Sequence, residues 1–331
     1  MGRIVAFGEI MLRLTPENKK LISGAESFGA FYGGSESNVL VALAGFGDET
    51  EYVTMLPDNE LGTAAIRHLK GYGVGCNHIV KNGNTLGMYF YEEGFGGRNA
   101  NVIYNRSNSE VTKMTEKDCD FDEIFRDCSI FHISGISFAI SKCAKDLSFR
   151  LMEEAKKRDV LISFDFNYRG KLWSVEEAGE VYREIMKYVD ILFCSEKDLN
   201  AFLNTTEEEF LKENSLKYYI RRERDTLENG DRIAWAKLCK CNGIPYEVAK
   251  RRDVVFPVQE KIGGGDAFAA GILHGIHCEE MNLQEILDFG LGCFALKHTI
   301  GGDVFSADEE SVKKFAEDLL SKEKKSKDVN R

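Results

Sequence analysis

The chain has 331 residues, of which 43% are hydrophobic and 29% charged. These values are ordinary for globular proteins and allow one large domain with a sizeable core. Fifty-four acidic against 43 basic residues give a formal charge of -11, which argues against nucleic acid as the main partner. A phosphate-binding site must therefore be built locally, from backbone amides and a few arginines.

The cellular location is predicted from the lack of targeting and membrane-spanning segments and from the cysteines. The first nine residues lack the apolar core and cleavage site of a signal peptide, and no stretch has the length of a membrane span. The nine cysteines are odd in number and follow no repeating spacing, which favours reduced thiols. The close pair Cys239 and Cys241 lacks a second cluster, so we interpret it as incidental and not as a metal site. We expect a cytoplasmic protein without membrane contact.

Strand and helix patterns alternate through the first 80 residues, which predicts parallel α/β layering. The predicted strands are 4–7, 11–14 and 51–55, with a further extended piece at 74–80. The predicted helices are 62–71 and the alanine- and leucine-rich stretch between Gly34 and Gly45.

An aromatic hairpin then interrupts this alternation. Residues 85–92 and 101–106 form extended runs around the glycine-rich segment 93–97. Antiparallel pieces that project beside a cleft commonly serve as lids, so we predict a small β-sheet lid formed by about 11–32 and 85–108.

The α/β alternation resumes after the hairpin. The predicted strands are 130–134, 160–164, 191–194, 218–221, 233–239 and 246–248. The predicted helices are 142–158, 176–188, 207–212, 266–277, 282–297 and 311–320. We expect a single doubly wound α/β domain over 1–320, with a mainly parallel sheet flanked by helices, and a solvated charged tail over 321–331.

The most informative segment is Gly263-Gly264-Gly265-Asp266, three glycines that lead directly into a helix of small residues. Successive glycine amides can face one point, and the helix N-terminus adds about half a positive charge, so the segment predicts an anion hole for phosphate oxygens. Asp266 would accept the proton of a substrate hydroxyl as that oxygen attacks a γ-phosphorus. Taken alone, the segment is equally consistent with a tight turn and a helix N-terminal carboxylate. Neither GxxxxGK[ST] nor a GxGxxG after the first strand is present.

Gly263 to Gly271 resembles the second signature of the PfkB carbohydrate kinases, and Gly33 to Gly47 resembles the first. The two signatures occur in the family's order and spacing. Residues 8–16, 164–173 and 296–303 are similar to stretches of the 2-keto-3-deoxygluconate kinases. The resemblance covers nearly the whole chain and is thinnest at 204–255.

This resemblance implies a ribokinase-like fold with a β lid, ATP and Mg²⁺ as cosubstrates, and phosphorylation of the terminal hydroxyl of 2-keto-3-deoxygluconate. It implies that Asp266 is the catalytic base. The positions matching the family's sugar-acid contacts are Gly34, Tyr89, Tyr104, Arg106, Arg169 and Asp303. Asn38, in the first turn after the glycines, is a further candidate contact, and Ser195, Gly263 and Gly265 are candidate nucleotide contacts.

Arg106 and Arg169 determine the expected substrate. A ketoaldonate has a carboxylate that guanidinium groups bind in bidentate fashion, whereas a neutral sugar has none. Arg169 follows a predicted strand, at the edge where doubly wound sheets place ligands. Without such carboxylate binding, another PfkB sugar kinase, such as a fructokinase, is the alternative. Tyr89 and Tyr104 can also serve cross-strand packing.

Two positions depart from the family pattern. Glu260 stands where aspartate is usual, and Ser195 to Asp198 stands where the metal-related Asn-x-x-Glu motif is usual. Asp198 retains a carboxylate for the water shell of Mg²⁺, so we assign it to the metal site and expect activity to survive. The alternative is a non-catalytic sugar-acid-binding protein of the same fold. By resemblance, pairing of lid edges predicts a homo-oligomer, a dimer or a multiple of one.

Overall fold

The computed structural model describes residues 2–95, 97–228, 230–241 and 246–321. Residue 96 of the predicted glycine-rich segment and the predicted tail beyond 321 lie outside these residues. In the described part of the chain, no helix combines the length and apolar character needed to cross a membrane. All nine cysteines are free thiols.

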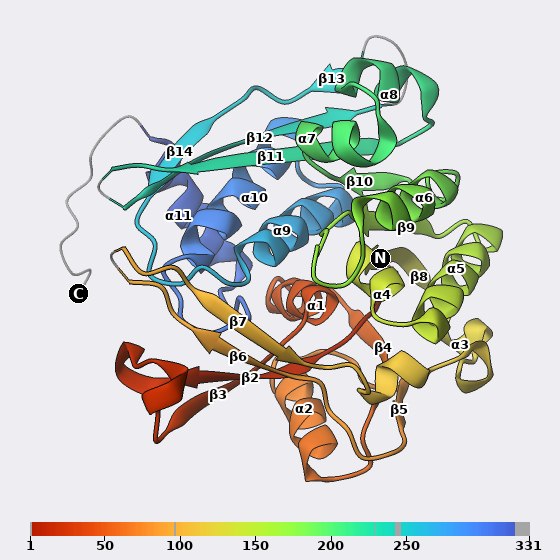
Figure 1. Cartoon of the computed structure of the whole chain (residues 1–331). Helices are drawn as coiled ribbons and strands as arrows, with labels where there is room; N and C mark the ends of the chain where they lie inside the picture. The colour runs from red at the N-terminus through yellow and green to blue at the C-terminus, as the bar shows by residue number, and fades with distance from the viewer. Residues whose placement is uncertain (1, 96, 229, 242–245, 322–331) are drawn as a thin grey trace.

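A ten-stranded sheet forms the centre of the molecule (Figure 1). Its strands are β1 (Arg3–Phe7), β4 (Thr50–Leu56), β5 (Ile79–Lys81), β8 (Cys128–Ser134), β9 (Leu161–Asp165), β10 (Ile191–Phe193), β11 (Tyr218–Thr226), β12 (Arg232–Lys240), β13 (Glu247–Val248) and β14 (Asp253–Phe256). The order is β13-β12-β11-β10-β9-β8-β1-β4-β5, and β14 also pairs with β12. Neighbours from β11 to β5 are parallel, whereas β12 is antiparallel to its partners.

Helices cover both faces of this sheet, because successive strand residues point to opposite sides. Ile4 and Ala6 of β1 belong to one buried cluster, and Val5 and Phe7 belong to another. The first cluster is completed by α1 (Ser35–Gly45), α2 (Glu60–Gly71), α9 (Gly264–Cys278), α10 (Leu283–Lys297) and α11 (Glu309–Leu320). The second is completed by α3 (Phe121–Phe125), α4 (Gly135–Ala139), α5 (Lys142–Lys157), α6 (Val175–Ile185) and α8 (Glu207–Glu213). The predicted doubly wound fold is confirmed.

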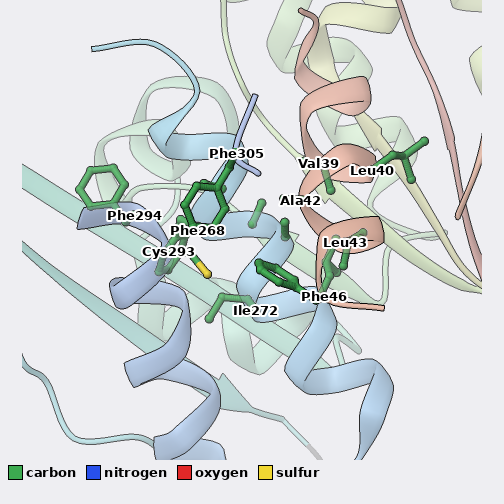
Figure 2. Packing of buried hydrophobic residues seen from close by; sticks show 14 of the residues in the cluster. Val39, Leu40, Ala42, Leu43, Phe46, Phe268, Ile272, Cys293, Phe294 and Phe305 are labelled. Atoms are coloured by element: carbon green, nitrogen blue, oxygen red, sulfur yellow. The ribbon is translucent and has the colours of Figure 1, made fainter. Parts of the chain in front are cut away.

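Helix α1 packs directly against α9, and this contact positions the candidate site. Figure 2 shows Val39 and Leu43 of α1, with Phe46 just beyond it, beside Phe268 and Ile272 of α9. All five side chains are buried. The two helices that carry the glycine-rich segments are therefore held in a fixed relation by a common apolar core.

Four strands form a separate small sheet at the lower left of Figure 1. They are β2 (Met11–Pro16), β3 (Phe28–Gly33), β6 (Met88–Glu92) and β7 (Asn101–Asn105), in the order β3-β2-β6-β7. Tyr89 of β6 lies directly opposite Tyr104 of β7 in an antiparallel pair. The predicted small sheet is confirmed, and its role as a lid stays a prediction.

Most expected elements are present, and the differences concern short elements and the end of one strand. Strand β11 runs to Thr226, past the predicted end at 221, because its charged second half pairs with β12. Strand β14 was not predicted, since it has only four residues of which two, Val254 and Phe256, are buried. The short α3, α4 and α7 (Glu196–Asp198) were also missed. The remaining turns are η1 (Glu17–Lys19), η2 (Ile22–Gly24), η3 (Glu110–Lys113), η4 (Glu116–Asp118) and η5 (Leu199–Leu203).

Candidate active site

A cleft of about 740 Å³ lies between the small sheet and the carboxyl ends of the main-sheet strands. Ligands of doubly wound proteins bind at this edge. Every site residue predicted from the sequence lines the cleft: Gly34, Asn38, Tyr89, Tyr104, Arg106, Arg169, Ser195, Asp198, Gly263, Gly264, Gly265, Asp266 and Asp303. The fold therefore brings together all the candidate residues, although it does not by itself assign their roles.

Two of the three glycines form a helix N-terminus that has no room for a larger side chain. Gly263 precedes α9 with φ of 79°, in the left-handed region that favours glycine. A Cβ on Gly263 would lie 2.0 Å from the carbonyl oxygen of Asp303, and one on Gly264 would lie 2.1 Å from the His298 ring. No side chain of the described residues caps this N-terminus. Its first backbone amides are therefore left for a ligand.

Asp266 lies in the first turn of α9, and side chains from the first turn of α1 orient it. Asn38 Nδ2 donates to Asp266 Oδ2 at 2.7 Å, and Ser35 Oγ donates to Oδ1 at 3.4 Å. Ser35 Oγ in turn accepts a bond from Asn167 Nδ2 at 2.6 Å. Burial raises the pKa of Asp266, and the bond from Asn38 partly opposes this rise. The carboxylate is thus fixed in direction and made more basic.

A second carboxylate, Asp165, stands at the end of β9 and was not predicted as a site residue. Its Oδ1 accepts the backbone N–H of Asn167 at 3.0 Å. Burial, and then the negative charge of Asp266, raise the pKa of Asp165 to about 7. Arg169 and Arg222 oppose this rise. The available signal was the position of Asp165 and Asn167 directly after a predicted strand. In that segment, only Arg169 was predicted to be a site residue.

On the small-sheet side, the rings of Tyr89 and Tyr104 lie against each other, with centroids 5.8 Å apart and planes tilted by 35°. The Tyr89 hydroxyl donates to Asp303 Oδ1, whereas Tyr104 is 38% exposed. Arg106 forms a buried ion pair with Glu9, and its Nε has no hydrogen-bond partner among the described residues. Glu9 therefore orients the Arg106 guanidinium and offsets its charge.

Arg169 differs from Arg106 in being exposed. Its NH1 donates only to nearby main-chain carbonyls, of Asn167 at 3.5 Å and of Tyr168 at 3.2 Å. The described residues supply no carboxylate that forms an ion pair with it. Its positive charge lowers the pKa of Asp266, so it lies within electrostatic reach of that carboxylate. Arg169 therefore keeps its charge available to a ligand.

The two departures from the family pattern have structural roles. Glu260 does not line the cleft: its Oε2 accepts from Arg13 NH1 at 3.3 Å, and its Oε1 accepts the amides of Lys261 at 2.8 Å and Ile262 at 3.1 Å. Glu260 thereby fixes the conformation of the loop that precedes Gly263.

Asp198 accepts from the Ser195 amide at 3.0 Å and from its hydroxyl at 2.7 Å, which closes a capping box on α7. The described residues contain no group of three His, Cys, Asp or Glu side chains suited to a metal ion. Mg²⁺ commonly binds through one or two carboxylates together with substrate phosphates, so this arrangement still suits it. Asp198 as a metal ligand stays a prediction.

Comparisons with known proteins place this site in a family. Residues 1–309 match the pfkB family of carbohydrate kinases. The chain is 30% identical over 315 residues to the 2-dehydro-3-deoxygalactonokinase of Haloferax volcanii, covering 95% of this chain and 96% of that one. The structure of Thermotoga maritima 2-dehydro-3-deoxygluconokinase matches with a TM-score of 0.89 and 32% identity, over 95% of this chain and 98% of that one. A PfkB family carbohydrate kinase from Listeria grayi matches with a TM-score of 0.89 and 28% identity, over 96% of this chain and 100% of that one. The chain belongs to the PfkB family of carbohydrate kinases, as its two glycine-rich signatures predicted.

Proposed function

We propose that the protein transfers the γ-phosphoryl group of ATP to the terminal hydroxyl of 2-keto-3-deoxygluconate, giving 2-keto-3-deoxy-6-phosphogluconate. One observation carries the proposal: the Asp266 carboxylate, oriented by Asn38 and Ser35, stands in the first turn of a glycine N-terminus that no described side chain caps. A base and an anion hole within one helical turn suit phosphoryl transfer to an alcohol. The relative from Thermotoga maritima is named for this reaction.

In the proposed reaction, Asp266 accepts the proton of the substrate hydroxyl as its oxygen forms a bond to the γ-phosphorus. The bond between that phosphorus and the bridging oxygen of ADP breaks, and ADP leaves. The amides of Gly264 and Gly265, with the positive end of the α9 dipole, stabilise the negative charge on the transferring group. Mg²⁺, when bound, neutralises charge on the phosphates, and Asp198 is the carboxylate we assign to its water shell.

Recognition of a sugar acid rests on Arg169 and Arg106. Arg169 has no described carboxylate partner, so it can pair with the substrate carboxylate in bidentate fashion. The charge of Arg106 is already balanced by Glu9, but its Nε–H has no hydrogen-bond partner among the described residues. In this assignment, the rest of the sugar acid lies against three further residues that line the cleft, Gly34, Tyr89 and Tyr104.

A second candidate substrate is 2-keto-3-deoxygalactonate, because the relative from Haloferax volcanii is named for that sugar acid. The two compounds differ in the configuration of a hydroxyl-bearing carbon. An enzyme distinguishes two such compounds strongly only where its site hydrogen-bonds the hydroxyl whose configuration differs.

A coupled ADP-release assay tests the proposal, with 2-keto-3-deoxygluconate, 2-keto-3-deoxygalactonate, gluconate, fructose and ribose as acceptors. We expect the two ketodeoxy acids to exceed the other acceptors by far in kcat/KM, with 2-keto-3-deoxygluconate the better of the two. The variant Asp266→Asn, which keeps the size of the side chain, should lose at least about two orders of magnitude in kcat. Equal turnover of fructose would overturn the substrate, and unchanged turnover by Asp266→Asn would overturn the mechanism.

A further inference from the structure

Lys297, the last residue of α10, has a completely buried side chain, although lysines are almost always exposed. Its Nζ donates to two main-chain carbonyls of the following turn, those of Ile300 and Gly302, both at 2.9 Å. Gly302 adopts φ of 88°, which lets the turn bring its carbonyl back to the ammonium. Lys297 does not line the cleft, so any effect that it has on a ligand passes through other residues.

Two segments that reach the cleft are built on the end of α10. The His298 carbonyl accepts the Glu260 amide at 3.0 Å, at the start of the loop that precedes Gly263. The turn held by Lys297 leads directly to Asp303, which lines the cleft. The two segments also touch, because a Cβ on Gly263 would lie 2.0 Å from the Asp303 carbonyl oxygen and 3.0 Å from Lys297 Cε. Lys297 therefore packs against the glycine N-terminus while it holds the turn that carries Asp303.

Four buried charges meet at this place, two positive and two negative. Arg13 lies 3.3 Å from Glu260 Oε2 and 3.0 Å from Asp303 Oδ2. Burial lowers the pKa of Lys297, and the charges of Glu260 and Asp303 oppose this fall. Burial raises the pKa of Asp303, and Arg13 and Lys297 are among the charges that lower it. Without the ammonium, two buried acids would share one arginine, and a buried charge without a partner is costly.

Capping of α10 does not by itself explain a buried lysine. A cation complements the dipole of a helix C-terminus equally well from the surface. Lys157, the last residue of α5, shows this arrangement, because 59% of its side chain is exposed. Taking an ammonium out of water costs more than such capping contributes. What the buried position of Lys297 adds is a fixed place for Asp303.

We propose that the Lys297 ammonium is an internal cation that positions Asp303 for the acceptor substrate. It does so by folding the turn 300–302, which sets the Asp303 carboxylate where it accepts the bond from the Tyr89 hydroxyl. The inference rests on the proposed function in taking Asp303 as a contact of the sugar acid. A carboxylate held in one direction selects a substrate hydroxyl in one place, since a hydrogen bond depends on its angle. Lys297 is thus a positioning residue that acts through Asp303.

A double-mutant cycle tests this role, with kcat/KM for the sugar acid measured by ADP release. Lys297→Met keeps an unbranched side chain of nearly the same length and removes the charge. We expect it to lower kcat/KM for the sugar acid at least about tenfold, the scale of one charge-assisted hydrogen bond. In a chain that already carries Asp303→Asn, the same substitution should lower kcat/KM by less than about twofold, because its effect passes through Asp303. Lys157→Met, the same change at the exposed end of α5, should change nothing.

Spectra of the unmodified protein give a result that does not depend on the folding of a variant. Exposed lysines exchange their ammonium protons with water rapidly, whereas a buried, hydrogen-bonded ammonium is protected. In proton–nitrogen correlation spectra of the full chain with isotope-labelled lysine, we expect a protected ammonium signal that shifts when the sugar acid is added. Absence of a protected signal, or a protected signal that the sugar acid leaves unmoved, would overturn the inference. If Lys297→Met does not fold, these spectra decide.

The outcomes separate this inference from the proposed function. Equal losses of kcat/KM with and without Asp303→Asn would indicate a general structural effect of Lys297 and overturn the inference. Unchanged kinetics in Lys297→Met would also overturn it and leave the proposed function intact. Fructose as the preferred acceptor would refute the proposed substrate, and a non-additive cycle measured with fructose would still support the role of Lys297.

Discussion

Replacing Arg13 by methionine tests whether buried ion pairs anchor the small sheet to the loops that carry Glu260 and Asp303. Arg13 comes from β2, and only 2% of its side chain is exposed. It lies 3.3 Å from Glu260 Oε2 and 3.0 Å from Asp303 Oδ2, and these two acids are 7% and 2% exposed. Removing the arginine leaves both acids buried without their cation. Breaking a buried pair in this way costs about 3–5 kcal/mol.

The geometry favours the lower end of that range. The contact between Arg13 Nε and Asp303 Oδ2 is close but lacks hydrogen-bond geometry, so that pair is weaker than its distance suggests. Asp303 also retains the bond from the Tyr89 hydroxyl. We therefore expect Arg13→Met to lower the free energy of unfolding by about 3 kcal/mol, measured by urea denaturation at pH 8.

The pH dependence distinguishes lost charge from lost packing. Arg13 lowers the pKa of Asp303, so the variant should hold this carboxyl at a still higher pKa in the folded state. The loss of stability in the variant is then fully present above this raised pKa. It disappears as the pH falls towards about 4, the pKa of an aspartate in the unfolded chain. Arg13→Met should thus lose less stability at pH 5 than at pH 8, and adding Glu260→Gln should restore part of the loss. A loss below about 1 kcal/mol, or an equal loss at both pH values, would refute this account.

Two further predictions concern the turn that carries Asp266. Asn38→Ala removes a hydrogen bond that lowers the pKa of Asp266. The acid limb of the plot of kcat/KM against pH should therefore move to higher pH. An unmoved acid limb would contradict the assignment of Asp266 as the base. Gly264→Ala drives a Cβ into the buried His298 ring and should cost about 1–3 kcal/mol in urea unfolding. Its control, Gly265→Ala, meets its nearest atom only at 3.4 Å and should leave stability unchanged; equal losses would refute the steric argument.

The arrangement of the cleft explains why both glycine-rich signatures are needed. A Cβ on Gly34 would lie 1.9 Å from the carbonyl oxygen of Glu9, so glycine lets the start of α1 approach the turn after β1. Asn38 and Ser35 then reach Asp266 from that first turn. The first signature therefore orients the Asp266 carboxylate that the second signature provides.

The sequence by itself determined the features that depend on local rules. The alternation of apolar strands and amphipathic helices predicted the doubly wound sheet, because side-chain periodicity is a property of the isolated strand or helix. Gly263 to Gly265 before a small-residue helix predicted the glycine N-terminus, because Gly263 adopts a positive φ that favours glycine. The order of the two signatures predicted the family, which the comparisons confirm.

Only the tertiary structure decided which charges are paired, since pairing joins residues that are distant in the chain. Arg106 meets Glu9 across 97 positions, and Arg13 meets Glu260 across 247. Burial and the approach of Asp266 raise the pKa of Asp165, and no local pattern records either cause. Strand pairing likewise places Arg222, Arg224 and Arg232 on one face of the β11–β12 pair, and all three line the cleft. An ionic interaction depends on distance and solvent exposure, which folding sets and the linear sequence does not contain.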